Sequence, residues 1–444
     1  MNAPASVRFA PAAPLHFLPA APRYCSYEST VLRVSLCSLP PCGGGPGRGG
    51  APQGRQRAIP AAAFPLSPNP SPARGEGRKD HAVHLTEPYC PPHREDGAGK
   101  DWVRTAVRHL TGDQLRAADT PLLKLEVPGL DGIDLYLKDE SVQPTGSLKH
   151  RLARSLFMHA ICSGRIREGT TVVEASSGST AVSEAYFARL LGLPFVAVVP
   201  VGTAPRKIEQ IRLHGGACHF VDDTTQIYAE ARRLARERGG HYMDQFTYAE
   251  QATDWRGPDS IAAGIFRQMA DEPHPEPAAI VMSAGTGGTA STIGRYIRYK
   301  GHDTRLVVAD PDHSVFYDSF RRGDRSLRGE HGSRIEGIGR PRVEPSFLAE
   351  VVDGMIKVPD AASIAALRWL ERLTGRRAGG STGTNLWGAL QIAGQMQARG
   401  ERGSIVTVLC DGGERYPDTY WNDEWVARHI GDMAPYLRRI EPLL

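Results

Sequence analysis

One lysine and two loops downstream of it carry residue types that could do chemistry together. Lys149 lies in the run E-S-V-Q-P-T-G-S-L-K-H-R at residues 140–151. The first loop, E-A-S-S-G-S-T at 174–180, is rich in hydroxyl groups, and the second, S-A-G-T-G-G-T at 283–289, is rich in glycine. A lysine amine can bind an aldehyde covalently, and loops of these two kinds can hold anionic groups. The combination favours an aldehyde cofactor that acts on an amino acid over a solvated surface lysine.

The glycine-rich loop follows an apolar strand pattern and precedes a helical one. This order directs backbone N–H groups and the positive end of a helix dipole at an anion. The glycines have no Cβ to obstruct a phosphate, and the threonines add hydroxyl donors. No G-K-[ST] follows, so a nucleotide-binding loop is disfavoured, and the alternative is a tight turn without a ligand. The predicted phosphate site consists of Gly285, Thr286, Gly287, Gly288 and Thr289.

The hydroxyl-rich loop also lies between a strand pattern and a helical pattern, S-E-A-Y-F-A-R-L-L. Its hydroxyls could cap that helix, and they could equally bind a substrate carboxylate at the helix N-terminus; the two uses are compatible. An amide after the next short strand could bind the same carboxylate, although a surface loop fits that position equally well. The predicted carboxylate site consists of Ser176, Ser177, Gly178, Thr180 and Gln245.

Short apolar runs rich in β-branched residues alternate with amphipathic stretches from about residue 101 onward. This alternation predicts an α/β protein with mainly parallel sheets covered by helices, in which sites form at the carboxyl ends of strands. Because the candidate residues are spread from Lys149 to Asp411, we expect two α/β lobes with the site in a cleft between them. The predicted strands are 172–174, 195–199, 219–221, 279–282, 305–308 and 405–409, and the predicted helices include 183–191, 227–238, 261–270 and 361–373.

The composition divides the chain after residue 98. Residues 1–98 hold 17 of the 34 prolines and the run G-G-G-P-G-R-G-G, with little apolar periodicity. Such a segment cannot bury enough apolar surface to offset the entropy of ordering, so we predict that it is disordered. A start codon assigned too far upstream explains it best, and Pro11 and Pro14 interrupt the apolar stretch that a secretory signal would need. Residues 99–444 are then the catalytic core.

Charge and cysteine content exclude several kinds of protein. Residues 1–98 carry 10 Lys+Arg and 6 Asp+Glu of the chain's 53 and 49, so the core holds 43 of each and is formally neutral. A neutral core disfavours nucleic-acid and membrane-surface partners, and no apolar run is long enough to span a bilayer. The core cysteines, Cys162, Cys218 and Cys410, are odd in number and widely spaced. We therefore expect no disulfide framework, no metal site and a cytoplasmic location.

Five segments in this order resemble the cysteine synthase and cystathionine β-synthase superfamily, whose members are pyridoxal-phosphate enzymes of fold type II. S-L-K-H-R resembles the lysine motif S-x-K-x-R, E-A-S-S-G-S-T the substrate loop P-T-S-G-N-T, and G-T-G-G-T the phosphate loop. R-I-E-G-I-G at 334–339 and D-G-G-E-R-Y at 411–416 resemble the G-I-G segment beside the ring and the C-terminal G-E-R-Y signature. Within the superfamily, D-E-S-V-x-P-T-G-S-L-K-H-R and S-T-G-T-N-L-W-G-A-L are most similar to bacterial L-cysteine desulfhydrases.

The resemblance implies two three-layer α/β/α lobes with mainly parallel sheets, pyridoxal phosphate on Lys149 and a homodimer. It also implies a small amino-acid substrate and β-elimination of L-cysteine to hydrogen sulfide, pyruvate and ammonia. Gly337 would line the substrate site, Ser179 would stand beside the phenolic oxygen of the cofactor, and Asp411 would face its pyridine nitrogen. Three positions depart from the superfamily: Ser179 replaces asparagine, Asp411 replaces serine or threonine, and His150 replaces aspartate without an evident reason in the sequence.

Other functions remain open from the sequence alone. A cysteine synthase would use the same lysine but add sulfide to a β-substituted amino acid. A serine or threonine dehydratase would share the elimination but expel hydroxide. A catalytically silent regulator of sulfur metabolism would not need a competent lysine, and the presence of Lys149 with both loops argues against it.

Deletion of residues 1–98 tests the proposed boundary of the catalytic core. Because this segment lacks a core-forming pattern, the truncated protein should keep its activity and its Tm nearly unchanged. Turnover and thermal unfolding of the full-length and truncated chains provide the comparison. An insoluble or inactive truncated protein would show that the segment packs on the enzyme.

Overall fold

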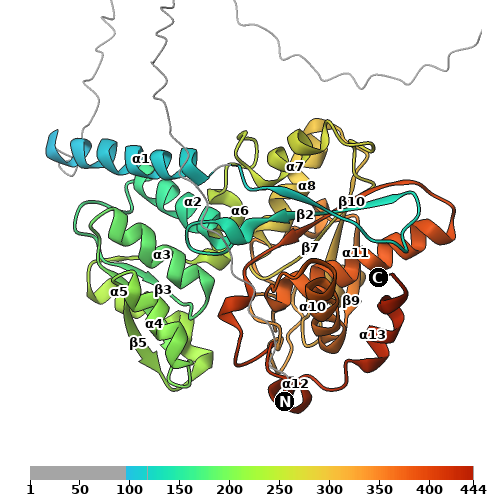
Figure 1. The fold of residues 1–444 in the computed structure, drawn as a ribbon. Coiled ribbons are helices and arrows are strands. Elements are labelled where there is room, and N and C mark those ends of the chain that lie inside the picture. Colours follow the sequence, from blue (N-terminus) through green and yellow to red (C-terminus); the bar gives the residue numbers. More distant parts are fainter. Residues whose placement is uncertain (1–96, 118, 444) are drawn as a thin grey trace, which may run out of the picture. The chain divides into compact units, whose positions relative to one another are not determined.

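The computed structural model describes residues 97–117 and 119–443. The predicted disordered extension, residues 1–98, lies almost entirely outside these residues, so its disorder and its boundary stay predictions. The described chain folds into two lobes, each built on its own sheet with helices on both faces (Figure 1). The predicted class, α/β with two three-layer lobes and mainly parallel sheets, is therefore confirmed.

Strands and helices alternate along most of the described chain. The strands are β1 (Leu122–Leu125), β2 (Ile133–Asp139), β3 (Val172–Glu174), β4 (Phe195–Pro200), β5 (Ala217–Val221), β6 (His241–Tyr242), β7 (Ala279–Ser283), β8 (Arg305–Pro311), β9 (Gly354–Val358) and β10 (Gly403–Leu409). The helices are α1 (Gly97–Ala117), α2 (Lys149–Cys162), α3 (Ser179–Leu190), α4 (Pro205–Leu213), α5 (Ile227–Glu237), α6 (Gln245–Ala252), α7 (Ile261–Met269), α8 (Gly288–Lys300), α9 (Phe316–Arg322), α10 (Asp360–Thr374), α11 (Gly380–Ala398), α12 (Asp423–His429) and α13 (Ala434–Ile440).

The larger lobe contains a six-stranded sheet in the order β1-β2-β10-β7-β8-β9. Its pairs are parallel except for β1 with β2. Successive side chains of a strand point to opposite faces, so each central strand supplies two cores. Val281 and Ile405 belong to the core that includes α10 and α11, whereas Ile280 and Val406 belong to the core that includes α7 and α8. Burial on both faces is what near-continuous apolar strands indicate.

The smaller lobe contains a four-stranded parallel sheet in the order β5-β4-β3-β6. Val172 packs in the core that α1, α2 and α3 cover, whereas Val173 and Val196 pack against α5. β5 was expected to be a buried strand, and that expectation is wrong because β5 is an edge strand. Its side chains are partly or fully exposed, and Phe220 keeps 42% of its surface in solvent.

All six predicted strands are present, and the predicted helices match α3, α5, α7 and α10. Local signals explain why these helices were found: Ser260 caps α7 by accepting from the Ala263 N–H at 3.1 Å, and Gly375 ends α10 at φ +71°. The strands β1, β2 and β9 were not predicted. Each carries charged residues within a short run, and β2 even buries Lys138, whose Nζ donates to the Thr120 carbonyl at 2.6 Å.

Backbone contacts place the start of α2 against the end of β10. The Leu148 N–H donates to the Cys410 carbonyl at 2.9 Å, and Ser147 pairs with Asp411 as an isolated antiparallel bridge. Lys149 therefore begins its helix beside the carboxyl end of a central strand, where sites form in parallel sheets. Among the described residues, no helix is both long enough and apolar enough to cross a bilayer.

Candidate active site

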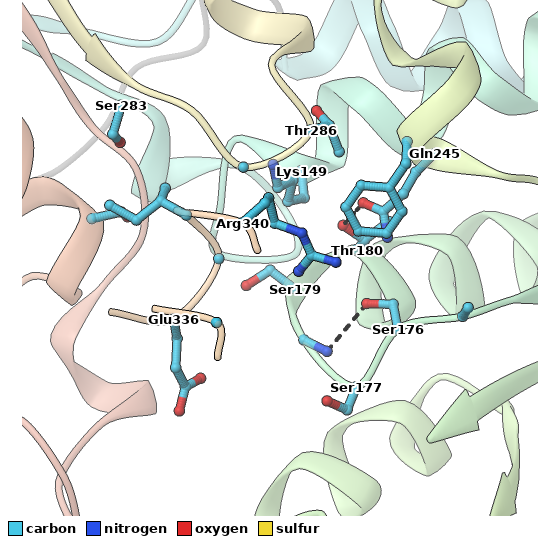
Figure 2. Close-up of a pocket in the computed structure, with 18 of the residues that line it drawn as sticks. Lys149, Ser176, Ser177, Ser179, Thr180, Gln245, Ser283, Thr286, Glu336 and Arg340 are labelled. Carbon is cyan, nitrogen blue, oxygen red and sulfur yellow. Dashed lines mark hydrogen bonds between the residues drawn. The ribbon is translucent and has the colours of Figure 1, made fainter. Parts of the chain in front are cut away.

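A cavity of about 600 Å³ contains the residues that the sequence singled out. Lys149, the loop at 176–180, Gln245, Gly337 and Asp411 all line it, together with Gly285, Thr286, Gly287 and Thr289. Figure 2 labels Lys149, Thr286 and Gln245 among them. Among the predicted site residues, Gly288 alone does not line this cavity. It begins α8, and a Cβ on it would lie 2.7 Å from the Cβ of Ala249.

Lys149 is the first residue of α2 and is partly buried in the cavity wall. Burial lowers the pKa of its amine, Arg340 lowers it further, and the nearby Cys410 and Asp411 oppose the shift. A lowered pKa increases the fraction of neutral amine, which is the form that acts as nucleophile or base. A backbone hydrogen bond fixes the position of the lysine, because the preceding residue, Leu148, donates its N–H to the Cys410 carbonyl.

The glycine-rich loop joins β7 to α8, as predicted, but its glycines are needed for a different reason. A Cβ on Gly285 would lie 2.0 Å from the Gly337 carbonyl oxygen, and one on Gly287 would lie 2.5 Å from the Cα of Phe347. Gly287 also has φ +88°. The loop is thus glycine-rich because other backbone segments pack against it, rather than only to admit a ligand.

The start of α8 remains available to an anion. Its N-cap is Gly287, which has no side chain; the Gly288 N–H donates to the Thr286 hydroxyl at 3.1 Å, and no side chain caps the N–H groups that follow in the first turn. Uncapped N–H groups at a helix start, with the positive end of the dipole, attract phosphate. The hydroxyl of Thr289 lies in the same cavity.

The hydroxyl-rich loop joins β3 to α3, and the expectation that its hydroxyls cap the helix is wrong. The N-cap is Gly178, and no side chain caps this helix. The Ser176 Oγ accepts from the Gly178 N–H at 3.3 Å, within the loop. The hydroxyls of Ser177 and Ser179 also line the cavity beside the uncapped helix start, an arrangement suited to a carboxylate.

Gln245 is part of the same wall, and the alternative of a surface loop at this position is wrong. Gln245 begins α6 and is 3% exposed. Its Oε1 accepts from the Thr180 hydroxyl at 2.8 Å, and its backbone N–H donates to Glu174 at 3.1 Å (Figure 2). The Gln245 side chain also hydrogen-bonds the Glu174 carboxylate, and the second hydrogen of its amide NH₂ is the donor that a substrate could use.

A pair of buried carboxyl groups lies behind the hydroxyl-rich loop. Burial raises the pKa of Glu174 to about 8 and raises that of Glu184 well above its ordinary value. Glu174 accepts from the N–H groups of Ala175 and Gln245, whereas neither carboxyl oxygen of Glu184 has a hydrogen-bond partner among the described residues. The proton therefore resides mainly on Glu184, because a neutral carboxyl costs less to bury.

Asp411 lies at the end of β10 and is buried. Its Oδ2 accepts from the Tyr416 hydroxyl at 2.6 Å, while its Oδ1 has no partner among the described residues. Burial raises the pKa of this carboxyl to about 6, although the Tyr416 hydrogen bond and Arg415 oppose the shift. An unpaired buried acceptor in a cavity wall is suited to an N–H donor from a ligand.

Two departures from the superfamily pattern have a structural account. The Ser179 Oγ accepts from Arg415 Nη1 at 3.3 Å, so the short side chain leaves room for this arginine. His150 is fully buried, with Nε2 2.9 Å from Asp113 Oδ1 and Nδ1 3.2 Å from the Thr145 hydroxyl. His150 thus links α2 to α1 and to the turn before the lysine.

Sequence reasoning missed the charged residues at the rim of the cavity. Arg340 reaches toward Ser179 and Thr180, with its guanidinium carbon 4.4 Å from the centre of the Phe246 ring (Figure 2). Lys207 of the smaller lobe pairs with Glu336 of the larger lobe at 2.8 Å. Arg340 could have been selected from the sequence, because it directly follows the G-I-G segment. No local sequence pattern indicates that Lys207 pairs with Glu336.

The comparisons with known proteins agree with this site. The protein-family model "Pyridoxal-phosphate dependent enzyme" matches residues 114–411. The chain belongs to this family of pyridoxal-phosphate dependent enzymes. It is 58% identical to L-cysteine desulfhydrase Cds1 of Mycobacterium tuberculosis, over 76% of this chain and 92% of that protein.

More distant relatives extend the similarity. Cysteine synthase 1 of Neurospora crassa is 27% identical, over 72% of this chain and 86% of that protein. The crystal structure of O-ureido-L-serine synthase matches with a TM-score of 0.62 and 26% identity, and it covers 70% of this chain and 98% of that one. The resemblance to the cysteine synthase and cystathionine β-synthase superfamily is confirmed.

The cavity fits pyridoxal phosphate by its own chemistry. The unpaired Oδ1 of Asp411 can accept from a pyridinium N–H, and the uncapped start of α8 can receive a phosphate. The amine of Lys149, with its lowered pKa, lies in the same cavity and can bind the aldehyde. Each group of the cofactor thus has a complementary group in this chain.

Replacement of the buried acid, Glu184→Gln, tests the carboxyl pair. Above pH 4.5, the ordinary pKa of a glutamate, the unfolded chain releases a proton that folded Glu184 retains, so stability is lost as pH rises toward the raised pKa of the folded state. The variant lacks this loss. Its Tm advantage over the wild type should therefore grow between pH 5 and pH 8, to the equivalent of about 1 kcal/mol or more.

Thermal unfolding at a series of pH values provides the measurement. Glu168→Gln, at an exposed glutamate, is the matched control and should show no such trend. An advantage of Glu184→Gln that is the same at every pH would contradict the assigned protonation.

Proposed function

We propose that this chain is an L-cysteine desulfhydrase: L-cysteine and water give hydrogen sulfide, pyruvate and ammonia. The observation that carries the proposal is one cavity that holds a lysine of lowered pKa, an uncapped helix start on each side and an unpaired buried carboxylate oxygen. The 58% identity to L-cysteine desulfhydrase Cds1 supports the choice of substrate.

The hydroxyl-rich loop would bind the substrate carboxylate. Ser176, Ser177 and Thr180 line the cavity at the N-terminus of α3, with Gly178 providing its backbone N–H group and Gln245 its amide. Holding the carboxylate there restricts rotation of the amino acid and presents its Cα–H to Lys149. This contribution is positioning, and it lowers the entropic part of the barrier.

Lys149 would both hold the cofactor and move the proton. When neutral, the Nζ of Lys149 would take the proton from Cα of the substrate. The same Nζ then carries a proton that it can donate to the departing sulfur. Burial favours this use because it lowers the pKa of the amine.

Asp411 and the glycine-rich loop would hold the two ends of the cofactor. The unpaired Oδ1 of Asp411 would accept from the pyridine nitrogen, and its carboxylate charge would keep that nitrogen protonated. Bound pyridoxal phosphate supplies an electron sink that stabilises negative charge at Cα. Gly285, Thr286, Gly287 and Thr289 line the phosphate end, while Gly288 supports them from behind.

The homodimer and the cytoplasmic location belong to this proposal. Leu115 and Val142 are 74% and 51% exposed, and a homodimer interface could cover such side chains. The three core cysteines, Cys162, Cys218 and Cys410, are free thiols, as is usual in a reducing compartment.

Loss of the lysine tests the proposed catalytic role. Lys149→Ala should lose cysteine cleavage by several orders of magnitude, because covalent anchor and base are removed together. Borohydride should reduce a yellow wild-type protein to an adduct on Lys149 and leave no adduct at this position in the variant. Lys300→Ala, at an exposed lysine of α8, is the control. Full retention of cysteine cleavage in Lys149→Ala would overturn the mechanism.

Substitution at Ser179 tests the choice between desulfhydrase and cysteine synthase. The wild type should release sulfide and pyruvate from L-cysteine faster than it makes cysteine from O-acetylserine and sulfide. Ser179→Asn restores the superfamily amide and should shift the ratio of the two kcat/KM values toward synthesis by about one to two orders of magnitude. One good hydrogen bond in a desolvated site contributes ~1 to 3 kcal/mol. A wild type dominated by synthesis would refute the desulfhydrase assignment but not the cofactor.

A further inference from the structure

A second cavity, of about 300 Å³, lies behind the glycine-rich loop. It is lined by residues of α2, α6, α7 and α8. Thr286 and Thr289 line both cavities, as does Leu148, the residue before the lysine. The volume is at the lower end of the range of small-molecule sites, about 300 to 1,000 Å³.

This cavity is lined by an arginine, Arg154, that has one buried nitrogen without a hydrogen bond. The side chain of Arg154 is 7% exposed, and its Nη1 has no hydrogen-bond partner among the described residues. Its nearest acidic group is Asp113, at 3.7 Å, which is too far for a hydrogen bond. Asp113 is already occupied, because His150 and Tyr186 contact its two oxygens at 2.9 and 3.0 Å. A buried guanidinium nitrogen without an acceptor is costly, so the cavity is suited to an anionic ligand.

The neighbouring Arg151, in contrast, has hydrogen-bond acceptors. Arg151 donates to both oxygens of Glu140, at 2.7 and 3.1 Å, and to the Asp259 carbonyl at 2.7 Å. Burial, together with repulsion from Arg151, lowers the pKa of Arg154 to about 10, although Asp113, Asp259 and Glu140 oppose the shift. An anion beside Arg154 would therefore relieve both the desolvation and the repulsion between the two arginines.

The same cavity also presents acceptors for a cation. Asp254 and Asp259 line it, and each has one carboxylate oxygen without a hydrogen-bond partner in the described chain. These carboxylates would repel a simple anion. A ligand that carries a negative and a positive group could pair with Arg154 and with the carboxylates at the same time. Leu152, Met158 and Ala252 provide apolar wall for a short side chain.

We propose that this second cavity binds a free α-amino acid with a small side chain. The carboxylate of the ligand pairs with Arg154, and its ammonium group pairs with Asp259 or Asp254. Because Thr286, Thr289 and Leu148 separate this site from the first cavity, occupancy affects the phosphate loop and the lysine. Any coupling between the two sites must be reciprocal, so a filled first cavity changes the affinity of the second. The site is independent of which reaction the first cavity performs.

Equilibrium dialysis of the holoenzyme with radiolabelled L-alanine tests the proposal. L-alanine has no leaving group on Cβ, so elimination does not consume it. The wild type should bind two equivalents per chain, and Arg154→Gln should bind one. The visible absorption change that reports L-alanine in the first cavity should persist in the variant. Arg165→Gln, an exposed arginine just beyond α2 and outside the cavity, is the matched control and should bind two.

Two further variants keep the test decisive. Arg154→Gln should fold, because Asp113 keeps His150 and Tyr186 as partners. If it does not, Ser155→Phe, at a partly buried position of the cavity wall, should fill the space and remove the same equivalent. Asp259→Asn should weaken the second equivalent by about tenfold, the value of one charge-assisted contact. A single equivalent in the wild type, or two in both Arg154→Gln and Ser155→Phe, would overturn the proposal.

Discussion

The hydrogen bond from the Leu148 N–H to the Cys410 carbonyl holds together two parts of the site that are far apart in sequence. With the bridge between Ser147 and Asp411, it fixes the start of α2 at the carboxyl end of β10. A lysine on a flexible loop would sample many positions relative to a bound cofactor. These backbone contacts restrict the lysine before any ligand binds. Such restriction is required if the amine is to be positioned effectively against a substrate.

The two sheets supply the other fixed points of the site. In parallel sheets the strand ends gather at one edge, so the loops after β3, β7 and β10 converge although they come from both lobes. Each loop is then locked by a specific contact. Glu174 accepts from the Gln245 N–H, Gly285 packs against the Gly337 carbonyl, and Asp411 accepts from the Tyr416 hydroxyl. The site is assembled by these contacts between loops rather than by any one motif.

Burial of charge is the main source of unusual chemistry in this core. Lys149, Glu184 and Asp411 each lose hydration, and each shifts its pKa toward the neutral form. Arg154 shows the same loss, and because an arginine remains charged its missing acceptors point to a ligand. The two cavities thus have a common wall. In both, a buried polar group lacks a partner in the protein, and a ligand could supply the missing hydrogen bond.

The sequence by itself determined the class of fold, the strands that surround the site and the loops that line it. These features are local, because apolar periodicity, glycines and hydroxyl groups determine the structure of residues adjacent to them in the sequence. Lys149 and the loop at 176–180 could be selected in this way, and the resemblance carried over Asp411 and Gly337. The sequence could not give the reason for the glycines of the phosphate loop, because Gly285 and Gly287 are required by segments more than fifty residues away.

Only the tertiary structure decided which polar groups are left without partners. The role of His150 follows from Asp113, which lies beside it in the fold, and nothing in the sequence distinguishes Glu184 and Arg154 from other charged residues. Whether such a side chain is hydrated, paired or stranded depends on what packs against it from other elements. Pairing is a property of three-dimensional neighbours, and for these residues the neighbours lie between about 10 and 40 positions away in the chain.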